Sequence, residues 1–244
     1  MTPSHSGSAV ADPPVAAFWF ITPTPVCAVL SIPAGRIDVV ASDRVDTTVE
    51  IRASDSSVKR DMKAAQRAVI EYTGNVMRIE LTTRIELMGP SGSVAVTIRL
   101  PSDSLIEAKS DSAVLSSVGR LQEVAFDGAL GTVEVEEAAD VHVTSAVGNV
   151  RIGRLDGDAH VSTAQGDIRI DEVVRGRLIL RTQVGSISVT AAAGVSAFME
   201  AGATVGRVRN ALESISGTPE VTIRATTVKG DITARTLNKE HSPS

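Results

Sequence analysis

A short glycine-led unit recurs along the sequence, with Val or Ile at the second and fourth positions after each glycine. Six full copies of this unit begin at Gly35, Gly92, Gly131, Gly148, Gly166 and Gly185, and partial copies begin at Gly206 and Gly230. Chance would give on the order of one full copy. The glycines from Gly131 to Gly185 are separated by steps of 17, 18 and 19 residues. A nearly constant period of this length is typical of one coil of a solenoid.

Apolar residues at every second position indicate strands, because successive side chains of a strand point to opposite faces. A second alternating segment precedes each glycine, at residues 141–146, 159–164 and 178–183. Each coil therefore reads as two strands joined by corners. We expect one corner at each glycine and the other near Asp140, Gly157, Gly176 and Gly194. The positions predicted to face the core are Val150, Ile152, Ile168, Ile170, Ile187 and Val189, whereas Arg151 and Arg169 should face outward in line with Glu134.

The part of the chain before the regular coils follows a different pattern. Alternation over 26–32 predicts an opening strand. Asp55, Ser56 and Ser57 offer N-cap oxygens, and helical spacing of apolar residues from Val58 to Val69 predicts one short α-helix near residues 57–68 that caps or braces the solenoid. The predicted fold class is thus all-β, a single-stranded parallel β-helix with one short helix. We expect one domain over 18–237, with a tail at 1–17 before it and a tail at 238–244 after it. Within the domain, the irregular strands and the helix occupy 18–100, and the regular coils with a C-terminal cap occupy 101–237.

Composition excludes several classes of function. The net charge of -5, the pI near 5.4 and an aromatic content of 2% argue against nucleic-acid binding, which requires clustered cations and stacking rings. The lone Cys27 cannot form an internal disulfide, and we interpret it as a small core or edge residue. The apolar run 15–21 is too short to span a bilayer, and it lacks the basic flank of a signal peptide. We therefore expect no integral membrane segment and a cytoplasmic location.

Residues 32–49, 206–210 and 229–232 resemble the DUF4097 family of β-strand-repeat proteins, of the “putative adhesin” type and in its actinobacterial form. The resemblance extends roughly from Phe18 to Leu237. It implies a parallel β-helix with no agreed catalytic motif. Related domains occur in bacterial envelope-stress proteins as sensing or docking modules, so the resemblance implies a link to the cell envelope or to stress. It supplies no functional residue for this chain.

A pair of histidines is the best candidate for site chemistry. His142 and His160 each lie six residues before a corner glycine, so they should stand in the same slot of successive coils, about 4.8 Å apart along the stack. The neighbouring coils place Ala125 and Ile179 in that slot, so no third ligand is supplied. Because zinc sites need three or four protein ligands, we interpret the pair as a surface ladder and predict neither a metal site nor a cofactor.

Clustered aspartates could instead indicate a glycan-cleaving or glycan-binding β-helix protein. The candidates lie near two corners, at Asp156, Asp158, Asp167 and Asp171. Aspartates of this kind are common in turns, where they bond the local backbone. The six aromatic residues are spread along the chain rather than gathered on one face. No nucleophile elbow or phosphate-binding loop is present.

We therefore predict a non-enzymatic scaffold or binding module whose flat faces dock an unidentified protein partner. A glycan-binding or glycan-cleaving protein is the first alternative. A self-assembling filament subunit is the second, and homo-oligomerisation stays open. The glycines at Gly131, Gly148, Gly166, Gly185, Gly206 and Gly230 are assigned a structural role at corners.

Overall fold

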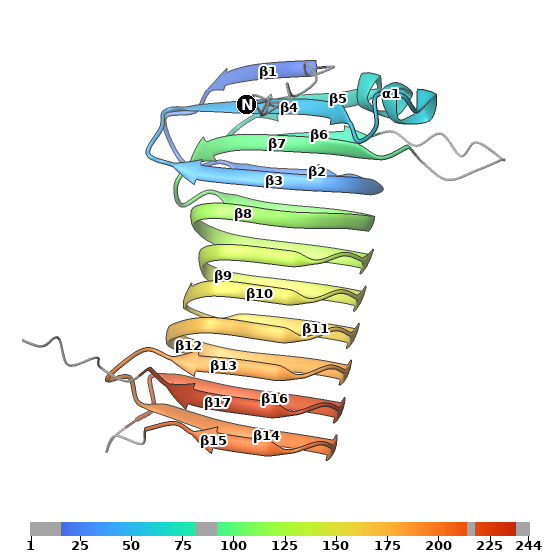
Figure 1. Cartoon of the computed structure of the whole chain (residues 1–244). Coiled ribbons are helices and arrows are strands. Elements are labelled where there is room, and N and C mark those ends of the chain that lie inside the picture. The colour runs from blue at the N-terminus through green and yellow to red at the C-terminus, as the bar shows by residue number, and fades with distance from the viewer. Residues whose placement is uncertain (1–15, 82–91, 214–217, 238–244) are drawn as a thin grey trace, which may run out of the picture.

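The computed structural model describes residues 16–81, 92–213 and 218–237, and it confirms a β-solenoid with one short helix (Figure 1). The first elements are β1 (Ala16–Ile21), β2 (Cys27–Ser31), β3 (Ala34–Ser42), β4 (Asp46–Ala53), α1 (Lys59–Gln66), β5 (Ala68–Thr73), β6 (Val76–Leu81) and β7 (Val94–Pro101). The regular coils comprise β8 (Leu105–Leu130), β9 (Val133–Val147), β10 (Val150–Asp156), β11 (Ala159–Gln165), β12 (Ile168–Val184) and β13 (Ile187–Ala191). The last elements are β14 (Ala197–Val205), β15 (Val208–Ala211), β16 (Val221–Lys229) and β17 (Ile232–Thr236). Within the described ranges, no helix is long and apolar enough to cross a membrane.

Each coil contributes one strand to each of two sides. The histidine side consists of the stacked segments 27–31, 76–81, 105–109, 121–130, 138–147, 159–165, 176–184, 221–229 and 197–205. The arginine side consists of 35–42, 94–101, 112–118, 133–138, 150–156, 168–175, 187–191, 232–236 and 208–211. The stacked coils pair in parallel, and long strands such as β8 and β12 bend around a corner from one side to the other.

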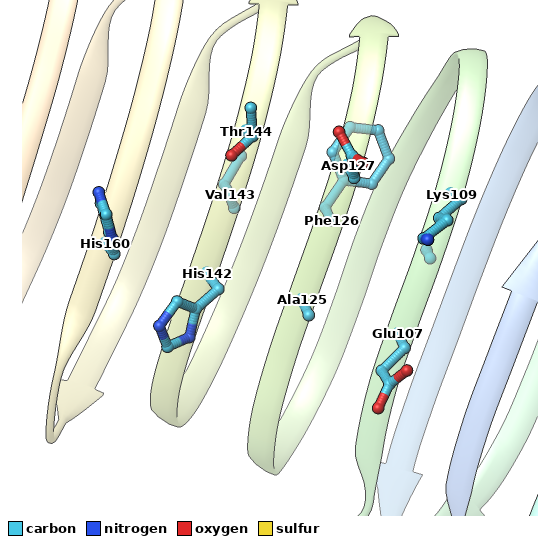
Figure 2. A pocket seen from close by; sticks show the side chains of 10 residues that line it. Glu107, Lys109, Ala125, Phe126, Asp127, His142, Val143, Thr144 and His160 are labelled. Carbon is cyan, nitrogen blue, oxygen red and sulfur yellow. The ribbon is translucent and has the colours of Figure 1, made fainter.

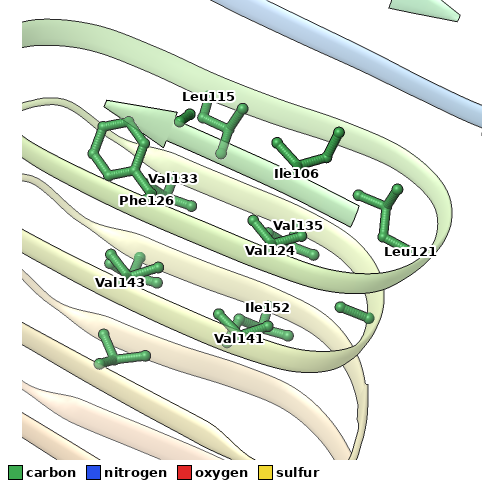
Figure 3. Packing of buried hydrophobic residues seen from close by; sticks show 14 of the residues in the cluster. Ile106, Leu115, Leu121, Val124, Phe126, Val133, Val135, Val141, Val143 and Ile152 are labelled. Carbon is green, nitrogen blue, oxygen red and sulfur yellow. The ribbon is translucent and has the colours of Figure 1, made fainter. Parts of the chain in front are cut away.

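The core consists of apolar side chains from the two sides, which point toward each other between the strands (Figure 3). All six positions predicted to face inward are at most 1% exposed: Val150, Ile152, Ile168, Ile170, Ile187 and Val189. In the parallel register, Val150 lies beside Val133 on one strand and beside Ile168 on the other. The same kind of side chain therefore stacks on itself from coil to coil, which buries a continuous apolar row without large aromatic residues.

Spatial order in the stack differs from chain order at both ends. The coil formed by β2 and β3 lies between β6–β7 and β8, because β2 pairs with both β6 and β8. The coil formed by β16 and β17 lies between β12–β13 and β14–β15, because β16 pairs with both β12 and β14. The last coil in the sequence is therefore not the last coil of the stack, as the red strands above the orange ones in Figure 1 show.

The predicted corner glycines stack on one another, and the close approach of their backbones excludes a side chain. Gly148 has a φ of 156°, and a Cβ added there would lie 1.7 Å from the carbonyl oxygen of Gly131. A Cβ on Gly166 would similarly lie 1.9 Å from the carbonyl oxygen of Gly148. Both the positive φ and the lack of space require glycine at these corners.

Three details before the regular coils differ from the sequence prediction. The first strand is β1, which pairs antiparallel with β4 and begins inside the segment 1–17 predicted as a tail. Helix α1 begins at Lys59 with Val58 as its N-cap and without a side-chain cap. Asp55 instead accepts hydrogen bonds from the backbone N–H and hydroxyl of Ser57, closing a local turn before the helix. Val69, which was counted in the helical spacing, belongs to β5 and is exposed. The predicted tail at 238–244 lies outside the described residues.

Candidate binding face

The histidine side carries an open hollow of about 310 Å³ on its outward face. Its polar lining comes from neighbouring coils within β8, β9 and β11, and consists of Glu107, Lys109, Asp127, His142, Thr144 and His160. Figure 2 shows these side chains in two rows across the strands, while Phe126 and Val143 point behind the sheet. Strand alternation produces this arrangement, since every second residue faces out.

The floor of the hollow is formed where a row of long side chains is interrupted by a small one. Ala125 stands beside His142 in the strand register. Figure 2 shows Ala125 in a row with His142 on one side of it and Glu107 on the other. The methyl group of Ala125 leaves a gap between two larger side chains, and this gap is open to solvent.

The predicted histidine slot is present. His142 and His160 are register partners, with ring centroids 6.2 Å apart and ring planes tilted by 59°. Ile179 follows His160 in the same row. The carboxylate of Glu123 lies 4.0 Å from Nδ1 of His142, within ion-pair distance of the ring when the imidazole is protonated. Among the described residues, no group of three or more His, Cys, Asp or Glu side chains is arranged to hold a metal ion.

Two charged side chains that line the hollow are available to a ligand. Neither the Lys109 ammonium nor the Asp127 carboxylate forms a hydrogen bond or an ion pair with a described residue. Cys27 is half-buried beside the hollow, with its Sγ 3.9 Å from Oε1 of Glu107. Burial and the negative charge of Glu107 raise the pKa of the Cys27 thiol. Cys27 is thus not a core residue, and its neighbour Ala28 points into the core instead.

The arginine side has a second hollow of about 320 Å³, and here the charged groups bind one another. Arg151 and Arg169 line up with Glu134 as predicted, and both guanidinium groups bind the carboxylate of Asp171. Burial acts to raise the pKa of Asp171, but the hydrogen bonds from Arg169 and Arg151 outweigh it, so that pKa lies below its usual value. This cluster is a surface ion network that links neighbouring coils.

The other candidate aspartates serve the corners. Asp158 accepts a hydrogen bond from the backbone N–H of Arg177 at 2.8 Å, and Asp167 accepts one from Ser186 at 2.7 Å. Asp156 forms an ion pair with Arg175 at 3.0 Å. Each carboxylate is therefore engaged by the adjacent coil, and the structure does not bring these aspartates together as a pair of acid and base.

The hollow itself was not predicted, although the histidine slot lies beside it. Continuing that slot one coil beyond Ala125 leads to Glu107, and the next outward position on each coil leads to Lys109, Asp127 and Thr144. The sequence signal for the hollow is a small outward residue, Ala125, between long outward residues on the neighbouring coils. This signal is visible only when segment 105–109 is aligned with segment 121–130, and the glycine period that would give the alignment is interrupted there.

A stack of parallel coils with two flat outward sides places the chain in the class of β-solenoid proteins. The chain belongs to the Toastrack DUF4097 family, whose model matches residues 30–243. This confirms the resemblance found from the sequence.

Several solved structures of bacterial proteins are similar to this chain. A “putative adhesin” of Bacteroides fragilis is 15% identical in sequence and has a TM-score of 0.53, with 91% of this chain and 96% of that chain covered. “Putative adhesins” of Parabacteroides merdae and Parabacteroides distasonis, at 8% and 14% identity, have TM-scores of 0.42 and 0.40 and the same coverage. At 15% identity, the similarity to the Bacteroides fragilis structure shows the fold alone. No curated protein has a sequence that matches this chain.

Proposed function

We propose that the protein is a non-catalytic module that binds a protein partner through the outward face of its histidine side. The observation that supports this most directly is the hollow above Ala125. Lys109 and Asp127, whose side chains have no partner in the described chain, line it on the outward face of the sheet. A docking face needs exposed area, a recess for a partner side chain and polar groups around that recess.

The same geometry favours binding over turnover. Catalysis of hydrolysis or group transfer needs a positioned acid and base in a site shielded from water. Here His142 has 55% of its side chain exposed, and the hollow is open to solvent. The aspartates that could act in glycan cleavage are held by corner backbone groups and arginines instead.

A protein partner fits the lining better than a glycan does. Glycan sites commonly offer an exposed aromatic ring on which a sugar stacks, and apart from the imidazoles the only ring lining the hollow is Phe126, which is 2% exposed. The coils on either side of the hollow extend the flat face well beyond it. An interface of ordinary size, about 800 Å² per partner, can therefore be accommodated. The family resemblance is consistent with a docking role at the cell envelope or in stress, which forms part of this proposal.

A substitution that fills the hollow without changing the core tests the proposal. Ala125→Arg places a long side chain outward into the hollow, and Ser116→Arg makes the matched change on the arginine side. The wild type and both variants, immobilised at equal density, would be exposed to extract of the native cell. We expect a partner retained by the wild type and by Ser116→Arg but lost with Ala125→Arg, at unchanged Tm. Equal retention by all three proteins would refute the assigned face, and turnover of a polysaccharide, ester or nucleotide by the wild type would refute the non-catalytic role.

A further inference from the structure

The stack ends in a layer whose strands have one open edge each. Among the described residues, β14 pairs only with β16, and β15 pairs only with β17. These strands form the last layer at the bottom of Figure 1. The inward side chains of this layer, Met199, Ala201 and Ala203, are only partly buried, and Val208 is 45% exposed.

The hydrogen bonds of the upper layers show which backbone groups of the last layer point away from the stack. On the arginine side the inward residue of each coil donates its N–H to the next layer, as Ile187 does to Asp231 and Ile232 does to Arg207. The equivalent residue in the last layer is Val208. On the histidine side, the inward residue Val221 donates its N–H to Ser196 in the same way. The inward residues of β14 have the same orientation as those of β16, with which they are in register. Met199, Ala201 and Ala203 therefore present their N–H groups at the open edge.

We propose that two copies of the chain associate end to end, each pairing its β14–β15 layer with that of the other. This goes beyond the proposed binding face and does not depend on it. A twofold axis normal to the two sides would place β14 antiparallel to β14 of the second copy and β15 antiparallel to β15. Both sides of the solenoid then continue across the interface, and inward residues stay inward.

The last layer is complementary to itself. In a pairing centred on Ala201, Met199 faces Ala203 of the second copy, which places a large side chain opposite a small one on both halves of the interface. Along the outward face of β14, the charged group Glu200 is already neutralised by Arg224 at 2.8 Å. Gly202 offers no side chain there. Strand β14 therefore lacks the unpaired charges that ordinarily protect an edge strand.

The opposite end of the stack differs in strand direction and length from the β14–β15 layer. This difference favours association of two identical ends over a head-to-tail filament. There the outer strands are β1 and β5, which run antiparallel to their neighbours β4 and β6. Each has six residues, whereas β14 has nine and β15 has four. The end with β14 and β15 has the regular cross-section of a coil, so pairing like ends joins strands of equal length.

Two features limit the affinity. The nine residues of β14 and four of β15 are fewer than the roughly 20–30 residues per partner of a standard interface. In addition, the exposed Arg207, directly before β15, and the exposed Arg209 within it meet the same arginines of the second copy. We therefore expect a dimer that dissociates on dilution and strengthens with added salt, because salt screens the repulsion between like charges.

Sedimentation velocity of the full chain over a wide concentration range tests the proposal. Ala201→Pro removes an N–H that faces the open edge, and it removes no hydrogen bond to β16. An edge strand tolerates proline at such a position. Ala203→Glu places a charge in the interface that stays partly exposed in the monomer. Each variant should weaken dimerisation at least about tenfold, which corresponds to 1.4 kcal/mol. Gly202→Ala is the matched control on the same strand, because its added Cβ meets nothing within 4 Å in the single chain and the substitution removes no edge N–H.

The arrangement of the copies is tested by a single cysteine. Gly202→Cys in a Cys27→Ser background lies near the proposed axis, so a short bifunctional maleimide should yield covalent dimers. A monomeric wild type, open-ended polymers, or a dimer indifferent to both β14 variants at unchanged Tm would each overturn the proposal. So would a dimer that weakens as salt is added.

Discussion

The carboxylate of Asp231 accepts a hydrogen bond of 2.9 Å from the backbone N–H of Arg207, a residue that precedes it by 24 positions. This bond belongs to a series at one corner of the stack. Asn149 accepts from Asp167, Asp167 from Ser186, and Ser186 from Asp231. The series follows the spatial order of the coils, and it places the C-terminal coil inside the stack rather than at its end.

The inserted coil can be tested with cysteine pairs in a Cys27→Ser background. Arg181 and Thr226 are outward register partners on β12 and β16, so cysteines at these two positions should form a disulfide under mild oxidation. Arg181 and Gly202 are closer in sequence, but β16 separates them, so that pair should stay reduced. Peptide mapping distinguishes the two results. A bond between positions 181 and 202 would show that β14 follows β12 directly.

Replacing one stacked glycine should be costly although it adds a single methyl group. Gly148→Ala combines a strained φ with a Cβ 1.7 Å from the carbonyl oxygen of Gly131. We expect a loss of at least about 1–3 kcal/mol in the free energy of unfolding, measured by urea denaturation. Gly202→Ala has open space at its Cβ and should change stability by less than about 0.5 kcal/mol. Equal costs for the two variants would contradict the corner geometry.

The ion network on the arginine side predicts a dependence of stability on pH. The pKa of Asp171 is lower in the folded protein than the usual value of about 3.9, so its interactions stabilise the fold fully above that value. This contribution is lost as pH falls through the lower folded pKa. Asp171→Asn should therefore be less stable than the wild type at neutral pH, and the difference should shrink below about pH 4. Urea denaturation at several pH values measures it. A difference that grows in acid would contradict the assigned sign.

The histidine pair should not create a transition-metal site. Two imidazoles with centroids 6.2 Å apart, without a third ligand among the described residues, offer too few donors for tight zinc binding. Calorimetric titration with zinc should give the same result for the wild type and for His142→Ala/His160→Ala. A micromolar site that disappears in the double variant would overturn this prediction.

Most of the coil geometry could be predicted because it repeats. The alternation at Ile168 and Ile170 and the glycine at Gly166 recur in neighbouring coils. The same repeat therefore indicates both the length of a coil and which of its side chains face the core. The order of the terminal coils could not be predicted in this way. Every coil presents the same alternating strands to its neighbours, so the pattern around Gly206 and Gly230 is compatible with either order. Corner contacts such as that between Asp231 and Arg207 reveal the order only once the coils are placed.

Helix α1 was predicted because its spacing is local, but its start was misplaced by two residues. Asp55 and Ser57 bond each other, and this local turn competed with the capping role assigned to them. The hollow above Ala125 depends on a contact between coils that no local pattern encodes. It depends on the register of the outward row in space.

The claim that the histidine side is the docking face is tested most directly by photo-cross-linking in the native cell. A photoreactive benzoylphenylalanine would replace His142 in one strain and Arg151, on the arginine side, in another. We expect one specific protein adduct from position 142, lost when Ala125→Arg is added, and no such adduct from position 151. An adduct of equal yield from both positions, or from position 151 alone, would show that the histidine side is not the docking face.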